Sequence, residues 1–262
     1  MTEWNASEYE RISVLQAAMA EEALSLLDLR GTESVLDIGC GQGRITREIA
    51  ARVPEGRVVG VDASEKMIAL AREHGAAFPQ PNLEFGVEDA RHLSFRNEFD
   101  LVVSFNALHW IPEQSLALDS IRTAVKPAGL VQLRLVAKGE RKSLEHVIEE
   151  IRRSPGWAGY FEGFRNPYLH LTPEEYGALA EQHGFSVLRN HIAEKTWDFQ
   201  SRGAFVAFGS VTFVEWTQHL PESARLDFIL DVLDCYRKIA CTQPGEENYF
   251  RFYQMDITLA PV

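Results

Sequence analysis

The sequence contains few cysteines, and none stands in a pattern that forms a disulfide framework or binds a metal. The three are Cys40, Cys235 and Cys241. An odd number without paired spacing argues against a disulfide scaffold, and no cysteine–histidine cluster has the spacing of a zinc site. We therefore expect no metal centre and a reducing, cytoplasmic environment.

Long apolar runs and an excess of positive charge are also missing. No apolar run approaches the roughly 18 residues that a membrane-spanning helix needs, and the polar start MTEWNASEYE is unlike a signal peptide. The formal net charge is −12, whereas general nucleic-acid binders need a positive field to displace counterions. We expect neither a membrane nor a nucleic acid as partner, and a monomer or homodimer.

The first half of the chain alternates short apolar segments with helical ones. Strands are expected at SVLDIG, RVVGVD, NLEFGVED, FDLVVSF and LVQLRLVAK, the last after a turn at Pro127 and Gly129. This alternation predicts βαβ units. We expect a Rossmann-like α/β fold with a seven-stranded, mostly parallel sheet and helices on both faces, in which the late strand YFRFYQMDITLA enters antiparallel.

The whole chain, 1–262, is expected to form a single domain with additions to a ligand-binding core. An amphipathic lid helix is expected within 1–29, the core within 30–137, and a helical cap in the insertions 138–184 and 195–246. In the second half, helices are expected at 138–153, 172–185, 201–218 and 222–241, with a loop at 154–170 and a strand at SVLRNHI. Ligands of such folds bind at the carboxyl ends of the strands.

A glycine-rich loop follows the first strand in the segment VLDIGCGQG. Gly39, Gly41 and Gly43 allow a sharp turn and close approach of a ligand to the backbone. A nicotinamide-binding fingerprint would need a further glycine at position 44, which is Arg44. The loop therefore favours a different ligand.

Three acidic residues follow three successive strands. Asp37 can accept hydrogen bonds from an ammonium, Asp62 from the two hydroxyls of a ribose, and Asp89 from the exocyclic amine of adenine. A ligand with an ammonium, a ribose diol and an adenine, but no phosphates, matches S-adenosylmethionine. We assign these further residues to the same site: Tyr9, Ala63, Met67, Ala90 and Asn106.

These segments carry a family resemblance. VLDIGCGQG, VVGVDAS, VEDA and KPAG resemble, in order and spacing, the class I S-adenosylmethionine-dependent methyltransferases. The resemblance covers at least residues 30–136. It implies S-adenosyl-L-methionine as cofactor and S-adenosyl-L-homocysteine as product.

The segment VVSFNALHWIP after the fourth strand bears on the acceptor of the methyl group. Trp110 offers one indole N–H, and Gln16 on the N-terminal helix offers a side-chain NH₂. Two neutral donors suit a carboxylate, which is already ionised at pH 7 and needs no base. We therefore expect a small organic or fatty acid that becomes a methyl ester by in-line transfer.

Resemblance within the family agrees with this expectation. Asn5, Tyr9 and Gln16, together with LHW at 108–110, are similar to juvenile hormone acid methyltransferases, in which the matching Gln and Trp hold the substrate carboxylate. WN at 4–5 and VEWTQHLP at 214–221 are similar to trans-aconitate methyltransferases. Both groups esterify carboxylates.

Other functions remain open from the sequence. His109 could act as general base in an O- or N-methyltransferase of a natural-product hydroxyl or amine, or the chain could bind the cofactor as a sensor without transfer. A polycarboxylate acceptor would need cationic partners, for which Arg134, Arg165 and Arg251 are candidates that could equally pair with acids.

Overall fold

The computed structural model describes residues 19–262, which divide into two compact units. One unit comprises residues 20–137, 168–193 and 254–262, and the other comprises 138–167 and 194–253.

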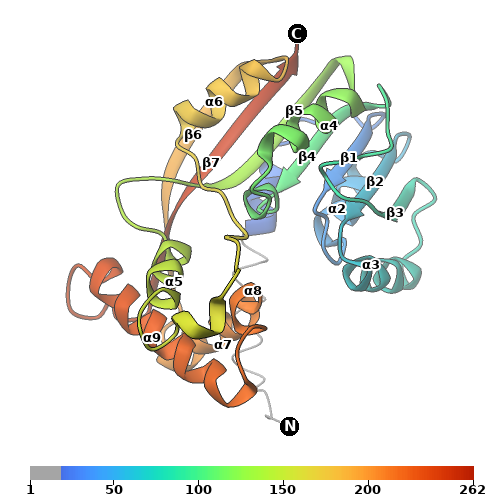
Figure 1. Ribbon diagram of the computed structural model, residues 1–262. Coiled ribbons are helices and arrows are strands. Elements are labelled where there is room, and N and C mark those ends of the chain that lie inside the picture. The colour runs from blue at the N-terminus through green and yellow to red at the C-terminus, as the bar shows by residue number, and fades with distance from the viewer. Residues whose placement is uncertain (1–18) are drawn as a thin grey trace. The chain divides into compact units, whose positions relative to one another are not determined.

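The sheet has seven strands in the order β3-β2-β1-β4-β5-β7-β6, of which the last strand of the chain is antiparallel (Figure 1). Its first four strands, all parallel, are β1 (Ser34–Ile38), β2 (Arg57–Asp62), β3 (Leu83–Val87) and β4 (Phe99–Phe105). The other three are β5 (Val125–Ala137), β6 (Phe185–Asp198) and β7 (Tyr249–Pro261). The sequence order reverses between β1 and β4, as expected for a fold that binds its ligand at that point.

Helices cover both halves of the parallel sheet. Helices α2 (Arg44–Arg52) and α3 (Glu65–Ala77) pack against β2 and β3, whereas α4 (Gln114–Ala124) packs against β4 and β5. Ser64 caps α3, because its hydroxyl accepts a hydrogen bond from the Met67 amide. Part of the core lies between the N-terminal segment and the sheet; its buried members include Ala23, Leu24, Val35, Ile49, Val58 and Val103.

Some predicted boundaries were wrong. The turn expected at Pro127 and Gly129 lies inside β5, where the register against β4 shifts between Phe99 and Leu101. A Cβ on Gly129 would lie 2.7 Å from Val125 Cγ2, so only glycine fits at this position. The extra residues of β5 form a bulge here, and the pairing of β5 with β4 continues after it. The N-terminal helix continues only through residue 25, not 29.

Two short elements and most of one strand, β6, belong to this first unit as well. The loop after β4 contains the 3₁₀ turn η1 (Leu108–Trp110). Helix α6 (Pro173–Gln182) begins with a capping box in which Thr172 and Glu175 exchange hydrogen bonds. Strand β6 then runs to Asp198 rather than ending at residue 192.

The second unit is mainly helical. It contains α5 (Leu144–Arg152), α7 (Arg202–Thr212), α8 (Val214–Thr217) and α9 (Glu222–Ala240), and α9 packs on α5 and α7. The helix expected over 201–218 is interrupted at Phe213, whose buried ring sits at a residue with φ −90° and ψ 18°. The loop expected at 154–170 holds a 3₁₀ turn, η2 (Ala158–Phe161), and residues 138–143 lie outside α5.

Candidate functional site

The glycine loop after β1 has the left-handed backbone that its sequence predicts. Gly39, Gly41 and Gly43 have φ values of 73°, 54° and 75°. A Cβ on Gly39 would lie 2.2 Å from Ala107 Cβ, and one on Gly43 would lie 2.5 Å from the Phe85 ring. A Cβ on Gly41 would meet no atom within 4 Å. The first and third glycines therefore permit packing, whereas the second borders open space that a ligand can enter.

Asp37 is a buried carboxylate at the carboxyl end of β1. Its side chain is 2 % exposed, and its Oδ2 accepts a hydrogen bond from the Thr46 hydroxyl at 2.7 Å. Burial, with a smaller contribution from the charge of Asp62, raises the pKa of Asp37 to about 6. A cationic ligand group would stabilise the ionised form, so this position suits an ammonium.

Asp62 ends β2 and holds the glycine loop. Its Oδ2 accepts from the Gly41 amide at 3.0 Å, and its Oδ1 accepts from the Ser64 amide at 2.9 Å. These bonds fix the carboxylate beside the open space at Gly41. The assigned neighbours Ala63 and Met67 are exposed at the start of α3.

Asp89 follows β3 and is held by Arg91. The guanidinium contacts both carboxylate oxygens, with Nη2 donating to Oδ2 at 2.6 Å and Nε lying 3.0 Å from Oδ1. These bonds keep the pKa of Asp89 below its usual range. The assigned neighbour Ala90 is buried.

Asn106 ends the fourth strand in a left-handed conformation, with φ 58°. Its amide donates to the Arg134 carbonyl at 2.8 Å, and its Oδ1 accepts from Gln254 Nε2 at 3.1 Å. Gln254 also donates to the Leu135 carbonyl at 2.7 Å. Strand β7 thus fixes the orientation of the Asn106 side chain.

His109 and Trp110 lie in the η1 turn. His109 is buried, and its Nδ1 accepts a hydrogen bond from the Val136 amide at 3.4 Å. Burial, and then the neighbouring His170, lower the pKa of His109 well below 6.5, so the ring is neutral at pH 7. Trp110 is half-buried.

The side chain of Gln114 stabilises the η1 turn by hydrogen bonds. Its Nε2 donates to the carbonyls of Leu108 and Ile111, the latter at 2.6 Å. On the other side, the Leu169 amide donates to the His109 carbonyl at 2.8 Å. Gln114 was missed from the sequence, because an amide near a helix start has no signature that sets it apart from an exposed one.

Two predicted residues, Tyr9 and Gln16, lie outside the described residues, so their roles stay predictions. The structure brings the other candidates to the carboxyl ends of the first four strands: Asp37, Gly39, Gly41, Gly43, Asp62, Ala63, Met67, Asp89, Ala90, Asn106, His109 and Trp110.

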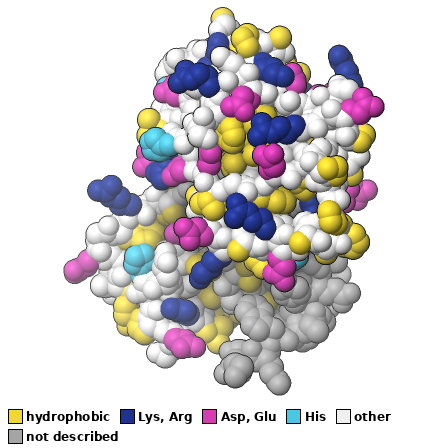
Figure 2. Space-filling view, turned by 90° about the vertical axis from the view of Figure 1, so that its right-hand side faces the viewer, with side chains coloured by type: hydrophobic (Ala, Val, Ile, Leu, Met, Phe, Trp, Pro, Cys, Tyr) yellow, Lys and Arg dark blue, Asp and Glu magenta, His cyan; other side chains and the backbone are white. Residues whose placement is uncertain are grey.

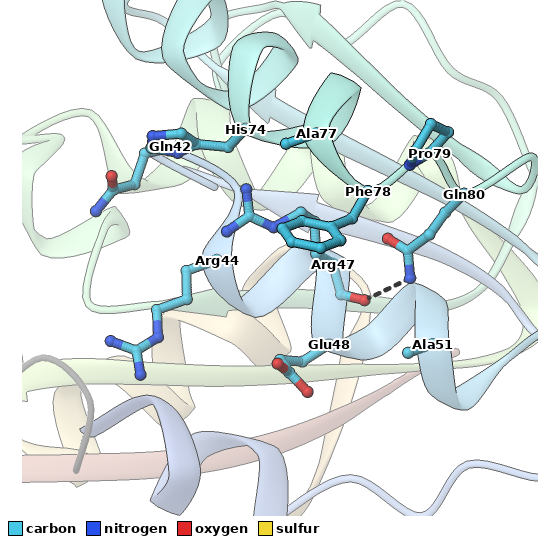
Figure 3. A pocket seen from close by; sticks show the side chains of 10 residues that line it. All are labelled: Gln42, Arg44, Arg47, Glu48, Ala51, His74, Ala77, Phe78, Pro79 and Gln80. Carbon is cyan, nitrogen blue, oxygen red and sulfur yellow. Dashed lines mark hydrogen bonds between the residues drawn. The ribbon is translucent and has the colours of Figure 1, made fainter.

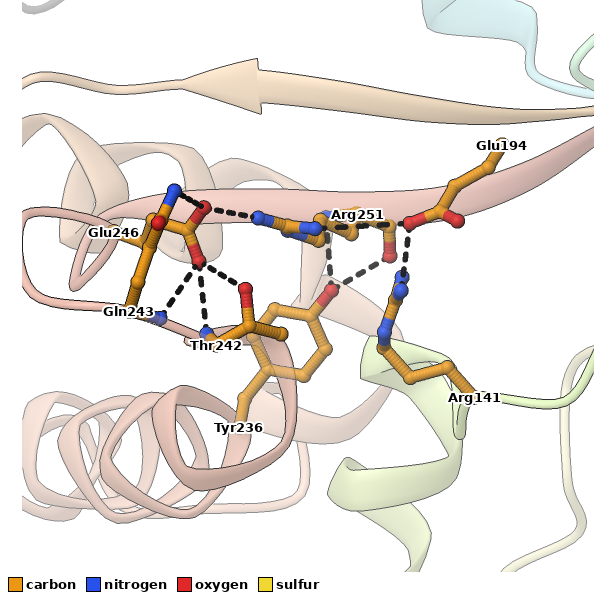
Figure 4. A network of polar contacts seen from close by, with 7 residues as sticks. All are labelled: Arg141, Glu194, Tyr236, Thr242, Gln243, Glu246 and Arg251. Atoms are coloured by element: carbon orange, nitrogen blue, oxygen red, sulfur yellow. Dashed lines mark hydrogen bonds and ion pairs between the residues drawn. The ribbon is translucent and has the colours of Figure 1, made fainter.

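The arginines suggested as partners of a second carboxylate differ in their surroundings. Arg134 is 1 % exposed and pairs with Asp256, and its Nη1 lies 3.3 Å from Glu22. In the other unit, Arg251 pairs with Glu246 at 2.6 Å (Figure 4). Arg165 is exposed.

Glu246 centres a polar network in the second unit (Figure 4). It accepts hydrogen bonds from the Thr242 hydroxyl and amide at 2.7 and 2.8 Å and from Gln243 Nε2 at 3.1 Å. These bonds, led by those from Thr242, lower the pKa of Glu246 to about 2. The network fixes the loop between α9 and β7 and already uses the charge of Arg251.

A separate hollow of about 790 Å³ lies between α2 and α3 (Figure 3). Arg44, Arg47, His74 and Phe78 are among its lining residues, and Asp37, Asp62 and Asp89 are not. It is therefore distinct from the predicted cofactor site.

Metal-binding clusters and membrane-spanning helices are not found among residues 19–262. The described part of the chain has no group of His, Cys, Asp and Glu arranged to hold a metal ion. Within the same residues, no helix is long and apolar enough to cross a membrane. On the face shown in Figure 2, basic and acidic side chains alternate without a large patch of one sign.

The charges of the predicted cofactor site suit S-adenosylmethionine. Among the described residues no cation pairs with the buried carboxylate of Asp37, and the space at Gly41 is open. The carboxylates of Asp62 and Asp89 lie at the ends of the next two strands. These three carboxylates would repel the anionic oxygens of a pyrophosphate.

Comparisons with known proteins agree. Residues 35–129 match the sequence model of the family described as a methyltransferase domain. Trans-aconitate 2-methyltransferase from Deinococcus radiodurans is 29 % identical over 258 residues, 95 % of each chain. Putative methyltransferase 235L of Invertebrate iridescent virus 6 is 26 % identical over 233 residues, 89 % of this chain and 85 % of the viral protein.

Solved structures share the fold. The YcgJ protein from Bacillus subtilis superposes with a TM-score of 0.66 at 18 % identity and covers 93 % of this chain and 97 % of its own. A putative methyltransferase from Bacillus halodurans gives a TM-score of 0.62 at 16 % identity, covering 93 % and 99 %. The sequence matches support an S-adenosylmethionine-dependent methyltransferase that resembles the trans-aconitate methyltransferases, and the solved structures show that it shares their Rossmann-like fold.

Proposed function

We propose that the protein transfers a methyl group to the carboxylate of a small organic or fatty acid and forms a methyl ester. The observation that carries this proposal is the state of His109 beside Trp110. A buried imidazole whose pKa lies well below 6.5 is a weak base, and its Nδ1 already accepts from the Val136 amide. An alcohol or amine acceptor needs a base, whereas a carboxylate does not.

The protein would then act by orientation and exclusion of water. S-adenosylmethionine supplies the electrophilic methyl group when bound. Asp37, Asp62 and Asp89 would hold its ammonium, ribose and adenine. The Trp110 indole N–H and the Gln16 amide would donate to the acceptor carboxylate and direct one oxygen along the line of transfer.

The relatives support the same reaction class. Trans-aconitate 2-methyltransferases recur among them, at 28–30 % identity over half or more of this chain. We further propose that 1–29 acts as a lid and that the insertions 138–184 and 195–246 form the substrate cap of a single-domain, cytoplasmic enzyme.

The surroundings of the three candidate arginines favour an acceptor with one carboxylate. Arg134 is buried against Asp256 and Glu22, and Arg251 is paired with Glu246. A guanidinium that forms a two-point ion pair has little capacity left for a substrate anion. Of these three candidates, Arg165 alone is exposed to solvent, in contrast to the several cations that a tricarboxylate would favour.

The test is incubation with isotopically labelled cofactor and a panel of acceptors, followed by mass spectrometry. The panel holds aliphatic monocarboxylic acids, trans-aconitate, phenols and primary amines. We expect methyl esters of the monocarboxylic acids. Methylation of phenols or amines alone would refute the carboxylate proposal, and tight cofactor binding without transfer to any acceptor would favour a sensor.

A further inference from the structure

Arg91 donates several hydrogen bonds to the Asp89 carboxylate, and neither the sequence analysis nor the comparisons give Arg91 a role. Its Nη2 donates to Oδ2 at 2.6 Å, its Nε lies 3.0 and 3.1 Å from the two oxygens, and its own backbone amide donates to Oδ1 at 2.9 Å. The planar guanidinium and the carboxylate therefore share one orientation.

The other end of the guanidinium is also held. Arg91 Nη1 donates to Glu113 Oε2 at 3.1 Å, so Arg91 lies between two carboxylates. Glu113 directly precedes α4 and the Gln114 side chain that fastens η1. The guanidinium cannot rotate away from Asp89 without losing its bond to Glu113.

Asp89 keeps capacity for one more donor. An ionised carboxylate offers about four lone-pair sites, and Arg91 is the one residue whose donors are found on it within the described chain. Those donors occupy the side of the carboxylate that faces the guanidinium. An exocyclic amine could approach an oxygen from another side.

We propose that Arg91 is a positioning residue of the cofactor site, which orients the Asp89 carboxylate toward the 6-amino group of adenine and so sets the preference of the enzyme for an aminopurine. The proposal concerns recognition of the cofactor and does not depend on which acceptor is methylated. It rests on the assignment of Asp89 to the adenine amine.

The test compares two ligands by isothermal titration calorimetry on the full-length protein. One is S-adenosylhomocysteine, and the other is its analogue in which hydrogen replaces the 6-amino group. The variants are Arg91→Ala, which removes the guanidinium, and Arg91→Lys, which keeps a charge without the planar fork. Glu113→Gln is the matched control, because it weakens the other ion pair of Arg91 and leaves the Asp89 fork in place.

We expect the unaltered protein to prefer the amino ligand about tenfold or more, as one oriented hydrogen bond to a charged group allows. Both Arg91 variants should lose most of this preference: about tenfold in affinity for S-adenosylhomocysteine and less than twofold for the analogue. Glu113→Gln should retain the preference.

Four results would overturn the proposal. Equal losses for both ligands would mean that Arg91 supports the whole loop rather than the carboxylate. Tighter binding of S-adenosylhomocysteine by Arg91→Ala would mean that Arg91 competes with adenine. Full preference in Arg91→Lys would mean that charge alone suffices, and no preference in the unaltered protein would mean that Asp89 does not receive the amine. No acceptor is present, so a failure of the carboxylate proposal would be seen only in the methylation assay.

Discussion

Arg134 of β5 and Asp256 of β7 form a two-point ion pair inside the sheet unit. Arg134 Nε donates to Oδ1 at 2.7 Å and Nη2 donates to Oδ2 at 2.9 Å, and the arginine side chain is 1 % exposed. Glu22 adds a second carboxylate 3.3 Å from Nη1. Because β5 also carries the carbonyl that binds the Asn106 amide, this pair supports the strand that borders the predicted site.

Replacing Arg134 by Met should destabilise the fold strongly. The change keeps an unbranched side chain but leaves the Asp256 carboxylate, 11 % exposed, without its cation. Breaking a buried pair from one side costs about 3 kcal/mol or more. Urea unfolding should show this loss, whereas Arg57→Met, in an exposed pair with Glu84, should cost less than about 1 kcal/mol. Similar losses in both variants would contradict the prediction.

The parallel sheet and the three acids could be predicted because their signals are local. An apolar run followed by Asp37 or Asp62 predicts a strand and marks its carboxyl end, where a ligand is expected. The structure has β1 and β2 at these positions. Parallel pairing then brings these ends to one edge without any long-range information in the sequence. The same logic placed Asp89 beyond β3.

What could not be predicted depends on partners distant in sequence. Arg134 was a candidate for a substrate anion until Asp256, 122 positions later, proved to be its partner. The bulge at Gly129 and the hydrogen bonds from Gln114 to the η1 turn depend on contacts that the neighbouring sequence does not specify. The role of Arg91 could have been predicted, since an arginine two positions after an acidic residue can reach its carboxylate.

The first and second glycines of the loop should respond differently to alanine. In Gly39→Ala, the new Cβ would meet Ala107 Cβ at 2.2 Å, so the loop must move and the fold should be destabilised. In Gly41→Ala, the Cβ enters open space, and only the left-handed backbone adds about 1–2 kcal/mol of strain.

Thermal unfolding and calorimetry would separate the two glycine variants. Gly39→Ala should lower both the melting temperature and the cofactor affinity. Gly41→Ala should remain folded at 25 °C and bind S-adenosylhomocysteine at least about tenfold more weakly, because its methyl group occupies the ligand's space. Unchanged affinity in Gly41→Ala would remove this position from the cofactor site.

Cofactor binding should depend on pH through Asp37. Burial raises its pKa to about 6, and an ammonium binds the ionised form. Because Asp37 must release one proton before it binds the ammonium, affinity for S-adenosylhomocysteine at pH 5 should be about tenfold weaker than at pH 7. Above pH 7 the affinity should be nearly constant. Asp37→Asn should bind weakly at every pH, without this slope. A steep slope that persists in Asp37→Asn would assign the titration to another group.

The raised pKa of Asp37 also predicts how the free energy of unfolding of the ligand-free protein varies with pH. The folded pKa of Asp37 lies above its unfolded value of about 3.9, so the folded state binds more protons between pH 4 and 6. Its contribution to stability is therefore present below about pH 4 and is lost as pH rises through 6. Asp37→Asn should unfold with a smaller decrease over this range in urea titrations. An identical decrease in the free energy of unfolding of both proteins would mean that the pKa of Asp37 is not raised in the folded state.

The indole N–H of Trp110 should matter for the acceptor and not for the cofactor. Trp110→Phe retains an aromatic ring in η1 and removes the donor. Loss of one hydrogen bond to a charged group, about 1.5–3 kcal/mol, should lower kcat/KM for a carboxylic acid by about ten- to a hundredfold. The Kd of S-adenosylhomocysteine should change less than twofold. If Trp110→Phe keeps full kcat/KM, the acceptor carboxylate is held by other donors.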